Sequence, residues 1–206
     1  MKFVDLSLAK LRQEMTQCRR CPLWQTRTQV VTGEGDPGAK LLLLGEAPGG
    51  HEDMISGQAF TGEAGEHLQE FLAVLNLTRA QIYLTNTVKC RPTRPSPRGR
   101  YGAYANRRPN ASEIQACRPW LEQELQLVAP ELIVTLGTVP LSFIVGKNCS
   151  MKDFHGRPFF AERYRAWVFP LFHPAAVIYN RRLQSVYLSD LVRLKEFMGT
   201  LFNRQS

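Results

Sequence analysis

Four short runs of apolar residues, each ending in polar or turn-forming residues, set the strongest limit on how this chain can fold. Continuous apolar runs of this length are typical of strands buried on both faces of a parallel sheet. They cover residues 40–47, 81–88, 131–137 and 166–174. Apolar residues recur with helical spacing in residues 6–17, 65–77, 112–129, 138–146 and 185–201. Ser112, with Gln115 three residues later, predicts a capping box at the start of the third of these helices. Strands that alternate with helices predict one α/β domain over residues 1–206, a three-layer α/β/α fold with a four-stranded, mainly parallel central sheet.

Polar side chains follow three of these predicted strands. Glu46 follows the first strand, Asn86 the second and His173 the fourth. In open parallel sheets, ligands bind beyond the carboxyl ends of the strands. Any strand has to end in polar loop residues, but Glu, Asn and His are also suited to hydrogen bonding a polar ring. We therefore predict a ligand site at this edge of the sheet.

The segment "LLLLGEAPGGHEDMISGQAFTGEAG" connects the first strand to the next helix. It lacks the Gly-Lys-Ser/Thr ending of a phosphate-binding P-loop, and it lacks the G-x-G-x-x-G pattern of a dinucleotide-binding turn. Pro48 and Gly49 predict a rigid turn that a ligand can approach closely. Phe60, between Gly57 and Gly62, has two interpretations: its ring faces a ligand, or it is an ordinary core residue.

One segment interrupts the alternation of strands and helices. Residues 91–112 contain six arginines, four prolines, two tyrosines and no acidic residue. Pro and Gly at this density exclude a regular helix. We interpret residues 91–111 as an insert, which is either a solvated loop or a basic, aromatic-bearing arm that follows a phosphate backbone.

The net charge of +8 arises from 26 Lys and Arg against 18 Asp and Glu. Such a charge fits either a basic protein without a special partner or one that is attracted to a polyanion. The sequence contains no apolar run long enough to predict a membrane helix and no signal-peptide pattern. We expect an intracellular, cytoplasmic monomer that does not bind membranes and associates with the nucleoid when it acts.

Five cysteines occur in the chain, an odd number that argues against a framework of disulfides in a reducing compartment. Cys18 and Cys21 have C-x2-C spacing, Cys90 follows the second strand, and Cys117 lies in the next helix. Thiolates are the usual ligands of iron–sulfur clusters and of structural zinc. A redox pair and buried unligated thiols are the alternatives. Cys149 is left over as a core or surface thiol.

Several motifs together resemble family 4 of the uracil-DNA glycosylases, iron–sulfur enzymes that remove uracil from DNA. The motifs are "VVTGEGDPGAKLLLLGEAPGGHEDMISGQAFTGEAG", "TNTVKC" and "FHPAA", with the four cysteines in the same order. The resemblance extends from about Cys18 to Leu201. It implies that Cys18, Cys21, Cys90 and Cys117 hold a [4Fe–4S] cluster.

The resemblance also implies roles in a uracil pocket. Phe60 would stack on the flipped base, Asn86 would read the amide edge of uracil, and His173 would donate a hydrogen bond to uracil O2. The loop from Glu46 to Gly49, including Ala47, would form one wall of the pocket. Glu52 would lie near C5 and exclude the methyl group of thymine.

Two further positions bear on the reaction and on DNA contact. Related families carry Asp or Asn at the position of Ala47 to activate water, so a carboxylate such as Glu46 or Glu52, or the backbone, would have to orient the water here. After "HPA", family members press a loop into the minor groove. The residues expected at that contact are Val177 and Ile178 as apolar wedges and Arg181 and Arg182 on flanking phosphates, unless this segment is only a packing turn.

The insert departs from the family pattern, because 26 residues separate Cys90 from Cys117. A related branch uses a histidine in a longer loop here to bond covalently to DNA, but this insert contains none. We expect the insert to contact DNA or to cover the cluster.

The implied activity is monofunctional hydrolysis of the N-glycosidic bond of deoxyuridine in DNA by base flipping, which leaves an abasic site. The matching motifs contain no lysine nucleophile, so we expect no strand cleavage. The cluster is expected to be structural, with a redox role left open. The alternatives are a glycosylase with another base preference and a non-catalytic iron–sulfur DNA-binding module.

Overall fold

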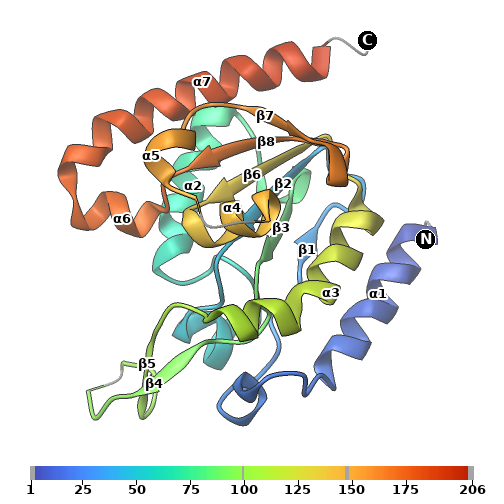
Figure 1. The fold of residues 1–206 in the computed structure, drawn as a ribbon, viewed down its shortest axis with the longest axis vertical. Coiled ribbons are helices and arrows are strands. Elements are labelled where there is room, and N and C mark those ends of the chain that lie inside the picture. Colours follow the sequence, from blue (N-terminus) through green and yellow to red (C-terminus); the bar gives the residue numbers. More distant parts are fainter. Residues whose placement is uncertain (1–2, 99, 147–148, 204–206) are drawn as a thin grey trace.

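The computed structural model describes residues 3–98, 100–146 and 149–203, and a six-stranded sheet lies at its centre (Figure 1). The strand order is β1-β3-β2-β6-β8-β7. The four inner strands run parallel, and the outer strands β1 and β7 run antiparallel to their neighbours. The strands are β1 (Glu34–Gly35), β2 (Leu41–Gly45), β3 (Tyr83–Asn86), β6 (Leu132–Leu136), β7 (Phe159–Ala161) and β8 (Ala166–Leu171).

The predicted fold class is confirmed, but the predicted number of strands is wrong. The four predicted strands are the four inner ones, β2, β3, β6 and β8. The two strands that the sequence did not predict, β1 and β7, contain 2 and 3 residues. Strands this short carry too few residues to show a pattern of alternation or burial.

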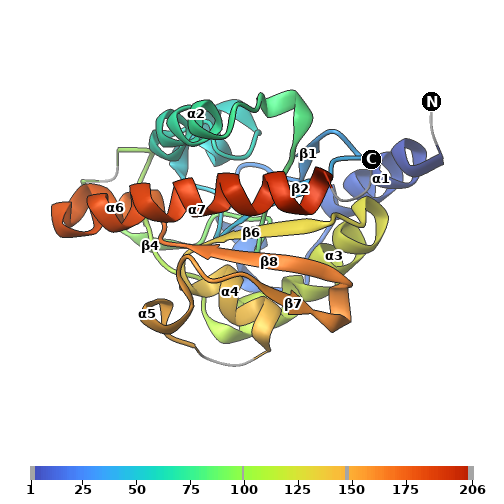
Figure 2. The same cartoon turned by 90° about the horizontal axis from the view of Figure 1, so that it is seen from above.

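Helices cover both faces of the sheet (Figure 2). Along β2 the side chains alternate between the two faces: Leu42 and Leu44 pack with α1, α3 and α4, whereas Leu41 and Leu43 pack with α2 and α7. Every residue of β2 is buried, which explains why its sequence is a continuous apolar run. The helices are α1 (Phe3–Thr16), α2 (Glu63–Leu75), α3 (Ala111–Val128), α4 (Thr138–Val145) and α7 (Gln184–Asn203).

These five helices correspond to the five predicted ones, with one local error at the start of α3. The predicted capping box of Ser112 and Gln115 is wrong, because the helix begins earlier. The side chain of Asn110 accepts from the Glu113 backbone N–H at 2.9 Å, and the Glu113 carboxylate accepts from the Asn110 N–H at 2.9 Å. Two bonds from Arg107 to the Glu113 carboxylate strengthen this cap and hold the pKa of Glu113 below its usual value.

Other elements were not predicted. The arginine-rich insert forms a two-stranded antiparallel hairpin, which projects from the body of the molecule (Figure 1). A π-helix follows the glycine-rich turn after β2. The additional elements are β4 (Thr93–Pro95), β5 (Tyr104–Asn106), the π-helix (Glu52–Ser56), α5 (Met151–Phe154) and α6 (Pro174–Tyr179). None of the described helices has the length and apolar character needed to span a bilayer.

The topology fixes where a ligand can enter. From β2 the chain continues to β3 on one side, and it later returns to β6 on the other side of β2. Helices on the two sides of such a reversal diverge, which opens a crevice at the carboxyl ends of the strands. The residues that follow β2, β3 and β8 therefore meet at one place.

Candidate active site

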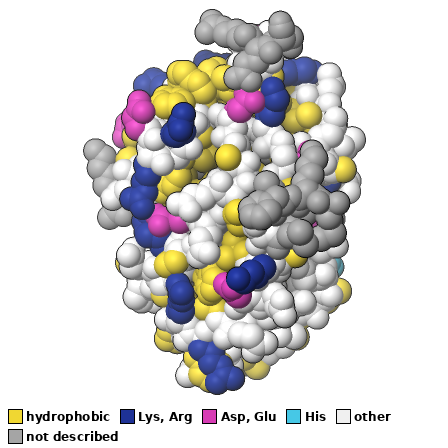
Figure 3. Space-filling model, turned by 90° about the vertical axis from the view of Figure 1, so that its right-hand side faces the viewer, with side chains coloured by type: hydrophobic (Ala, Val, Ile, Leu, Met, Phe, Trp, Pro, Cys, Tyr) yellow, Lys and Arg dark blue, Asp and Glu magenta, His cyan; other side chains and the backbone are white. Residues whose placement is uncertain are grey.

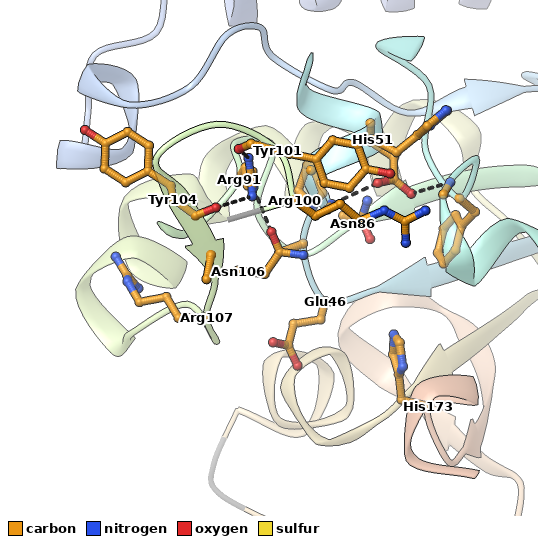
Figure 4. Close-up of a pocket in the computed structure, with 18 of the residues that line it drawn as sticks. Glu46, His51, Asn86, Arg91, Arg100, Tyr101, Tyr104, Asn106, Arg107 and His173 are labelled. Carbon is orange, nitrogen blue, oxygen red and sulfur yellow. Dashed lines mark hydrogen bonds between the residues drawn. The ribbon is translucent and has the colours of Figure 1, made fainter. Parts of the chain in front are cut away.

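A cavity of about 550 Å³ lies at the carboxyl ends of the inner strands. Glu46, Asn86 and His173 line it from the ends of three different strands, as the sequence predicted (Figure 4). The cavity also brings together the other residues expected around a flipped base. These are Ala47, Gly49, Glu52 and Phe60.

Gly45, the last residue of β2, makes room for two of these side chains. A Cβ atom at this position would lie 2.3 Å from Asn86 Oδ1 and 2.6 Å from Phe60 Cζ. The amide of Asn86 and the ring of Phe60 therefore meet in the space that a side chain at residue 45 would fill. This close approach explains why the strand ends in glycine.

Phe60 is a core residue, one of the two interpretations drawn from the sequence, and it also lines the cavity. Its side chain is only 5% exposed and packs in the core between α2 and the sheet. Its backbone has a φ of 55°, in the left-handed region that non-glycine residues rarely adopt. Strain of this kind is concentrated at functional sites, where the surrounding structure holds it in place.

Glu52 uses its carboxylate to join two loops of the cavity wall. Oε2 accepts from the Gly49 backbone N–H at 3.1 Å, and Oε1 accepts from the backbone N–H groups of Thr61 at 3.2 Å and Gly62 at 3.0 Å. The side chain is buried. Glu52 thus fixes the turn after β2 against the segment that carries Phe60.

Glu46 is the other carboxylate of the wall, and it points into the cavity region (Figure 4). Loss of solvation on burial raises the pKa of Glu46 above its usual value, and the positive charge of Arg108 partly opposes that effect. A carboxylate in this setting is a stronger base than one in water.

The raised pKa of Glu46 leads to a testable prediction about stability. A carboxyl whose pKa is raised by folding stabilises the native state at pH values below 4.5, its ordinary pKa. This contribution is lost as the pH rises through the raised pKa of the folded state. We expect Glu46→Gln to be more stable than the wild type at neutral pH and to lose this advantage as the pH falls toward 4.5.

Thermal unfolding of both proteins from about pH 4 to about pH 8 measures this difference. Glu162→Gln, at an exposed position on the turn before β8, is the matched control and should show no such pH-dependent gain. Identical melting temperatures of Glu46→Gln and wild type at every pH would contradict the account of Glu46.

His173 enters the cavity from the loop after β8. Gly137, at the end of β6, has a φ of 90° and would place a Cβ atom 3.2 Å from His173 Cβ. The Gly137 N–H also donates to the Leu171 carbonyl at 2.8 Å, so that the ends of β6 and β8 are held together. His173 is half-buried, and its imidazole faces the cavity from the side opposite the hairpin (Figure 4).

The insert supplies a large part of the cavity lining, which the sequence did not predict. Tyr101 and Asn106 reach the cavity from the hairpin (Figure 4). The basic and aromatic composition of the insert is the only signal in the sequence that points to this position. The residues that the insert contributes are Arg91, Arg98, Arg100, Tyr101, Tyr104, Ala105, Asn106 and Arg107.

Four cysteines surround a second, small apolar cavity next to α1 and α3. Cys18, Cys21, Cys90 and Cys117 all line it, as the sequence grouping predicted. Each of the five cysteines is a free thiol, and Cys149 lies elsewhere, with its Sγ 3.4 Å from Ser142 Oγ. Three separate segments, the N-terminal helix with its turn, the exit of β3 and α3, therefore converge at this cavity.

Nitrogen donors point at three of these sulfur atoms. Trp120 Nε1 donates to Cys18 at 3.2 Å, Arg27 Nη1 to Cys90 at 3.3 Å, and the Lys89 backbone N–H to Cys117 at 3.3 Å. Such donors favour sulfur that carries negative charge.

Burial opposes that charge. It raises the pKa of the Cys117 thiol to about 12 and also raises the pKa of the Cys21 and Cys90 thiols. Binding of a metal centre here would thus release protons. Within residues 3–98, 100–146 and 149–203, no group of three or more Cys, His, Asp or Glu side chains is arranged to hold one metal ion.

A buried ion pair lies between the cysteine cavity and the candidate active site. Lys89, which is only 1% exposed, donates to Glu124 Oε2 at 2.5 Å, to Thr85 Oγ1 at 2.6 Å and to the Asn86 carbonyl at 2.8 Å. Glu124 also accepts from the Gly33 N–H at 2.9 Å. Lys89 therefore connects α3 to the backbone of Asn86, and it directly precedes Cys90.

The segment expected to press into DNA begins directly after His173. It forms the short helix α6 rather than a loop, followed by a 3-10 turn (Arg181–Leu183) that leads into α7. Val177 is half-buried and Arg182 is exposed. The side chains of Ile178 and Arg181 lie outside the described part of the structure.

Comparisons with known proteins show the family of this chain. Residues 32–194 match the family model described as the uracil DNA glycosylase superfamily. A type-4 uracil-DNA glycosylase of Sulfurisphaera tokodaii is 37% identical over 94% of this chain and 86% of its own length. Proteins of the same description from Saccharolobus solfataricus and Archaeoglobus fulgidus are each 34% identical, over 94% and 96% of this chain and 88% and 98% of their own lengths.

The family match covers the sheet and every strand exit that lines the cavity. The relatives extend the likeness to nearly the whole chain, including the segment with the first two cysteines. This chain belongs to the uracil DNA glycosylase superfamily.

Proposed function

We propose that this protein is a DNA repair glycosylase, which hydrolyses the N-glycosidic bond of deoxyuridine in DNA, releases uracil and leaves an abasic site. The observation that carries the proposal is the single cavity lined by Phe60, Asn86 and His173 from three distant parts of the chain. Membership of the superfamily supports the same activity.

The target base has to leave the DNA stack to reach such a cavity, at a cost of a few kcal/mol. The ring of Phe60 provides a flat surface for the flipped base. The amide oxygen of Asn86 would accept from uracil N3–H, and the amide nitrogen would donate to O4. Cytosine has an acceptor at N3 and a donor at N4, so it does not match this pair. Asn86 thereby distinguishes uracil from cytosine.

Departure of the base leaves negative charge on the uracil ring, mainly on O2 and O4. His173 would donate to O2 and Asn86 to O4, so both stabilise that charge as it develops. Fixed donors inside a cavity act more strongly than donors in water and need no reorganisation during the reaction. We assign most of the rate enhancement to this pair.

The attacking water needs a partner other than residue 47, because Ala47 has no polar side chain. Glu46 is the better placed carboxylate, because the carboxylate oxygens of Glu52 already accept hydrogen bonds from three backbone N–H groups. We therefore propose that Glu46 orients the water. Glu52 holds the wall in shape and keeps the thymine methyl group out.

We propose that Cys18, Cys21, Cys90 and Cys117 hold a [4Fe–4S] cluster. When bound, the cluster adds covalent iron–sulfur links between the N-terminal segment, the exit of β3 and α3. The N–H donors on three of the sulfurs and the basic residues Arg20 and Arg27 at the cavity suit an anionic centre.

The other proposed contacts concern DNA. Val177 and Ile178 would press into the minor groove, and Arg181 and Arg182 would hold phosphates on either side of the flipped nucleotide. The enzyme is proposed to act as a monomer and one domain, inside the cell and on the nucleoid.

A simple experiment tests the activity. Purified protein is incubated with oligonucleotides that contain a single uracil, hypoxanthine or mismatched thymine, and alkali then cleaves any abasic site. Uracil release is expected from the first substrate only, without strand cleavage before alkali is added. Release from another substrate would replace the proposed specificity, and binding without release would replace the enzyme by a DNA-binding module.

A further inference from the structure

A buried arginine holds the β4–β5 hairpin in place over the cavity. Arg91 is only 3% exposed, and its guanidinium donates to Asn106 Oδ1 at 2.7 Å, to the Tyr104 carbonyl at 3.1 Å and to the Tyr101 carbonyl at 3.3 Å. Its Nη1 also lies 4.0 Å from the carboxylate of buried Asp53. The hairpin is therefore anchored to the π-helix and is not a free arm.

Tyr101 forms a second anchor. A Cβ atom on Gly50 would lie 2.3 Å from Cδ2 and 2.6 Å from Cγ of the Tyr101 ring, so the ring packs directly on the glycine turn after β2. The same ring meets His51 edge to face, with ring centroids 6.5 Å apart. Because the turn after β2 also carries Glu46, the hairpin and the base site form one continuous wall (Figure 4).

The hairpin and the π-helix beside it combine positive charge with exposed apolar groups. Arg94 and Arg98 are exposed and have no ion-pair partner among the described residues. Met54 of the π-helix is exposed and lies next to the hairpin, since a Cβ atom placed on Gly102 would be 3.6 Å from Met54 Cε. Ile55, the next residue of the π-helix, is 65% exposed. Tyr104 adds an exposed ring. We call Met54, Ile55, Arg94, Arg98 and Tyr104 the hairpin surface.

Another face of the molecule has a different character. Figure 3, seen from the side of α1, shows basic and acidic side chains scattered among apolar ones over that face. The insert, by contrast, contains no acidic residue. Arginines without an ion-pair partner among the described residues, next to exposed rings and aliphatic groups, are the composition of a surface that binds a single nucleic-acid strand.

We propose that the hairpin surface binds the single DNA strand that carries the flipped nucleotide. Arg94 and Arg98 contact its phosphates, and Tyr104 with Met54 and Ile55 contacts the bases beside the flipped one. A cavity of about 550 Å³ has room for more than one pyrimidine ring, and its hairpin side would receive the sugar and phosphate of the same nucleotide. This inference rests on the proposed function, which it extends from the base to the strand.

The test uses a single-stranded oligonucleotide with one tetrahydrofuran abasic analogue, which the enzyme cannot process. Its affinity is measured at several salt concentrations for the wild type and for Arg94→Ala/Arg98→Ala. Each lost phosphate contact is expected to reduce the slope of log affinity against log salt by about 0.7, and the double variant by about 1.4. Lys10→Ala/Arg163→Ala removes the same charge from α1 and from the turn before β8, and should keep the wild-type slope.

A second pair of variants tests the aromatic contact. Tyr104→Ala is expected to weaken binding about 5-fold or more, since the stacking of a base on an aromatic ring contributes about 1–3 kcal/mol. Phe160→Ala removes a similarly exposed ring from the edge strand β7 and should bind as the wild type does.

The two hypotheses fail in different ways. A wild-type protein that releases uracil, together with an Arg94→Ala/Arg98→Ala variant that keeps the full salt slope, overturns the hairpin surface and leaves the proposed function standing. A wild-type protein that releases no uracil, while the double variant loses the slope, overturns the function and supports the surface.

Discussion

Replacement of His173 by alanine is expected to slow uracil release by about 100- to 1,000-fold. The variant lacks the donor that would face uracil O2 as negative charge develops there. His173 is half-buried and lies in the loop after the strand, so the fold should be retained. The loss is therefore expected in the chemical step.

Single-turnover assays with enzyme in excess over a uracil oligonucleotide separate that step from binding. His173→Gln keeps a side-chain N–H and should recover part of the lost rate, whereas a merely structural role would not distinguish the two variants. Asn86→Ala should lose rate to a similar extent and also weaken discrimination against cytosine. A His173→Ala variant with the wild-type rate would refute the assignment of His173.

The second large effect is expected for stability, at the buried pair of Lys89 and Glu124. Lys89→Met removes the cation and leaves a carboxylate that is 0% exposed without its charge partner. Breaking a buried ion pair from one side costs about 3–5 kcal/mol of unfolding free energy. For a chain of this size, that corresponds to a fall in the melting temperature of about 6–20 °C.

Thermal unfolding of the purified protein measures this effect, and two further variants interpret it. Lys89→Met/Glu124→Gln removes the stranded charge but keeps an acceptor for the Gly33 N–H, so it should recover much of the lost stability. Lys40→Met breaks the partly exposed pair with Glu131 and should cost less than about 1 kcal/mol. Equal losses in Lys89→Met and Lys40→Met would contradict the burial argument.

The sequence predicts those parts of this molecule in which the pattern of apolar residues matches the burial of their side chains. The run of leucines in β2 is buried on both faces, and the fold class follows from such runs. The sequence alone groups the side chains of Glu46, Asn86 and His173, because parallel strands end at the same edge of the sheet. The four cysteines converge as their resemblance to family 4 implied.

Other features depend on contacts between distant residues, which no local pattern records. The hairpin in the insert is held by Arg91, a residue that looks like any other arginine of a basic segment. Lys89 and Glu124 resemble surface charges in the sequence, yet both are buried against each other. Asn110 and Ser112 are both suitable residues to cap the start of α3, and the structure uses Asn110. The two bonds from Arg107 to Glu113 stabilise this choice, and the local sequence does not show them.

The two outer strands of the sheet have a consequence for the behaviour of this protein in concentrated solution. Long, flat outer strands offer rows of backbone groups to which other chains can attach. Here β1 has 2 residues and contains Gly35, and β7 has 3, so each offers only a short template for such growth. The enzyme should therefore resist fibrous self-association while its fold is intact.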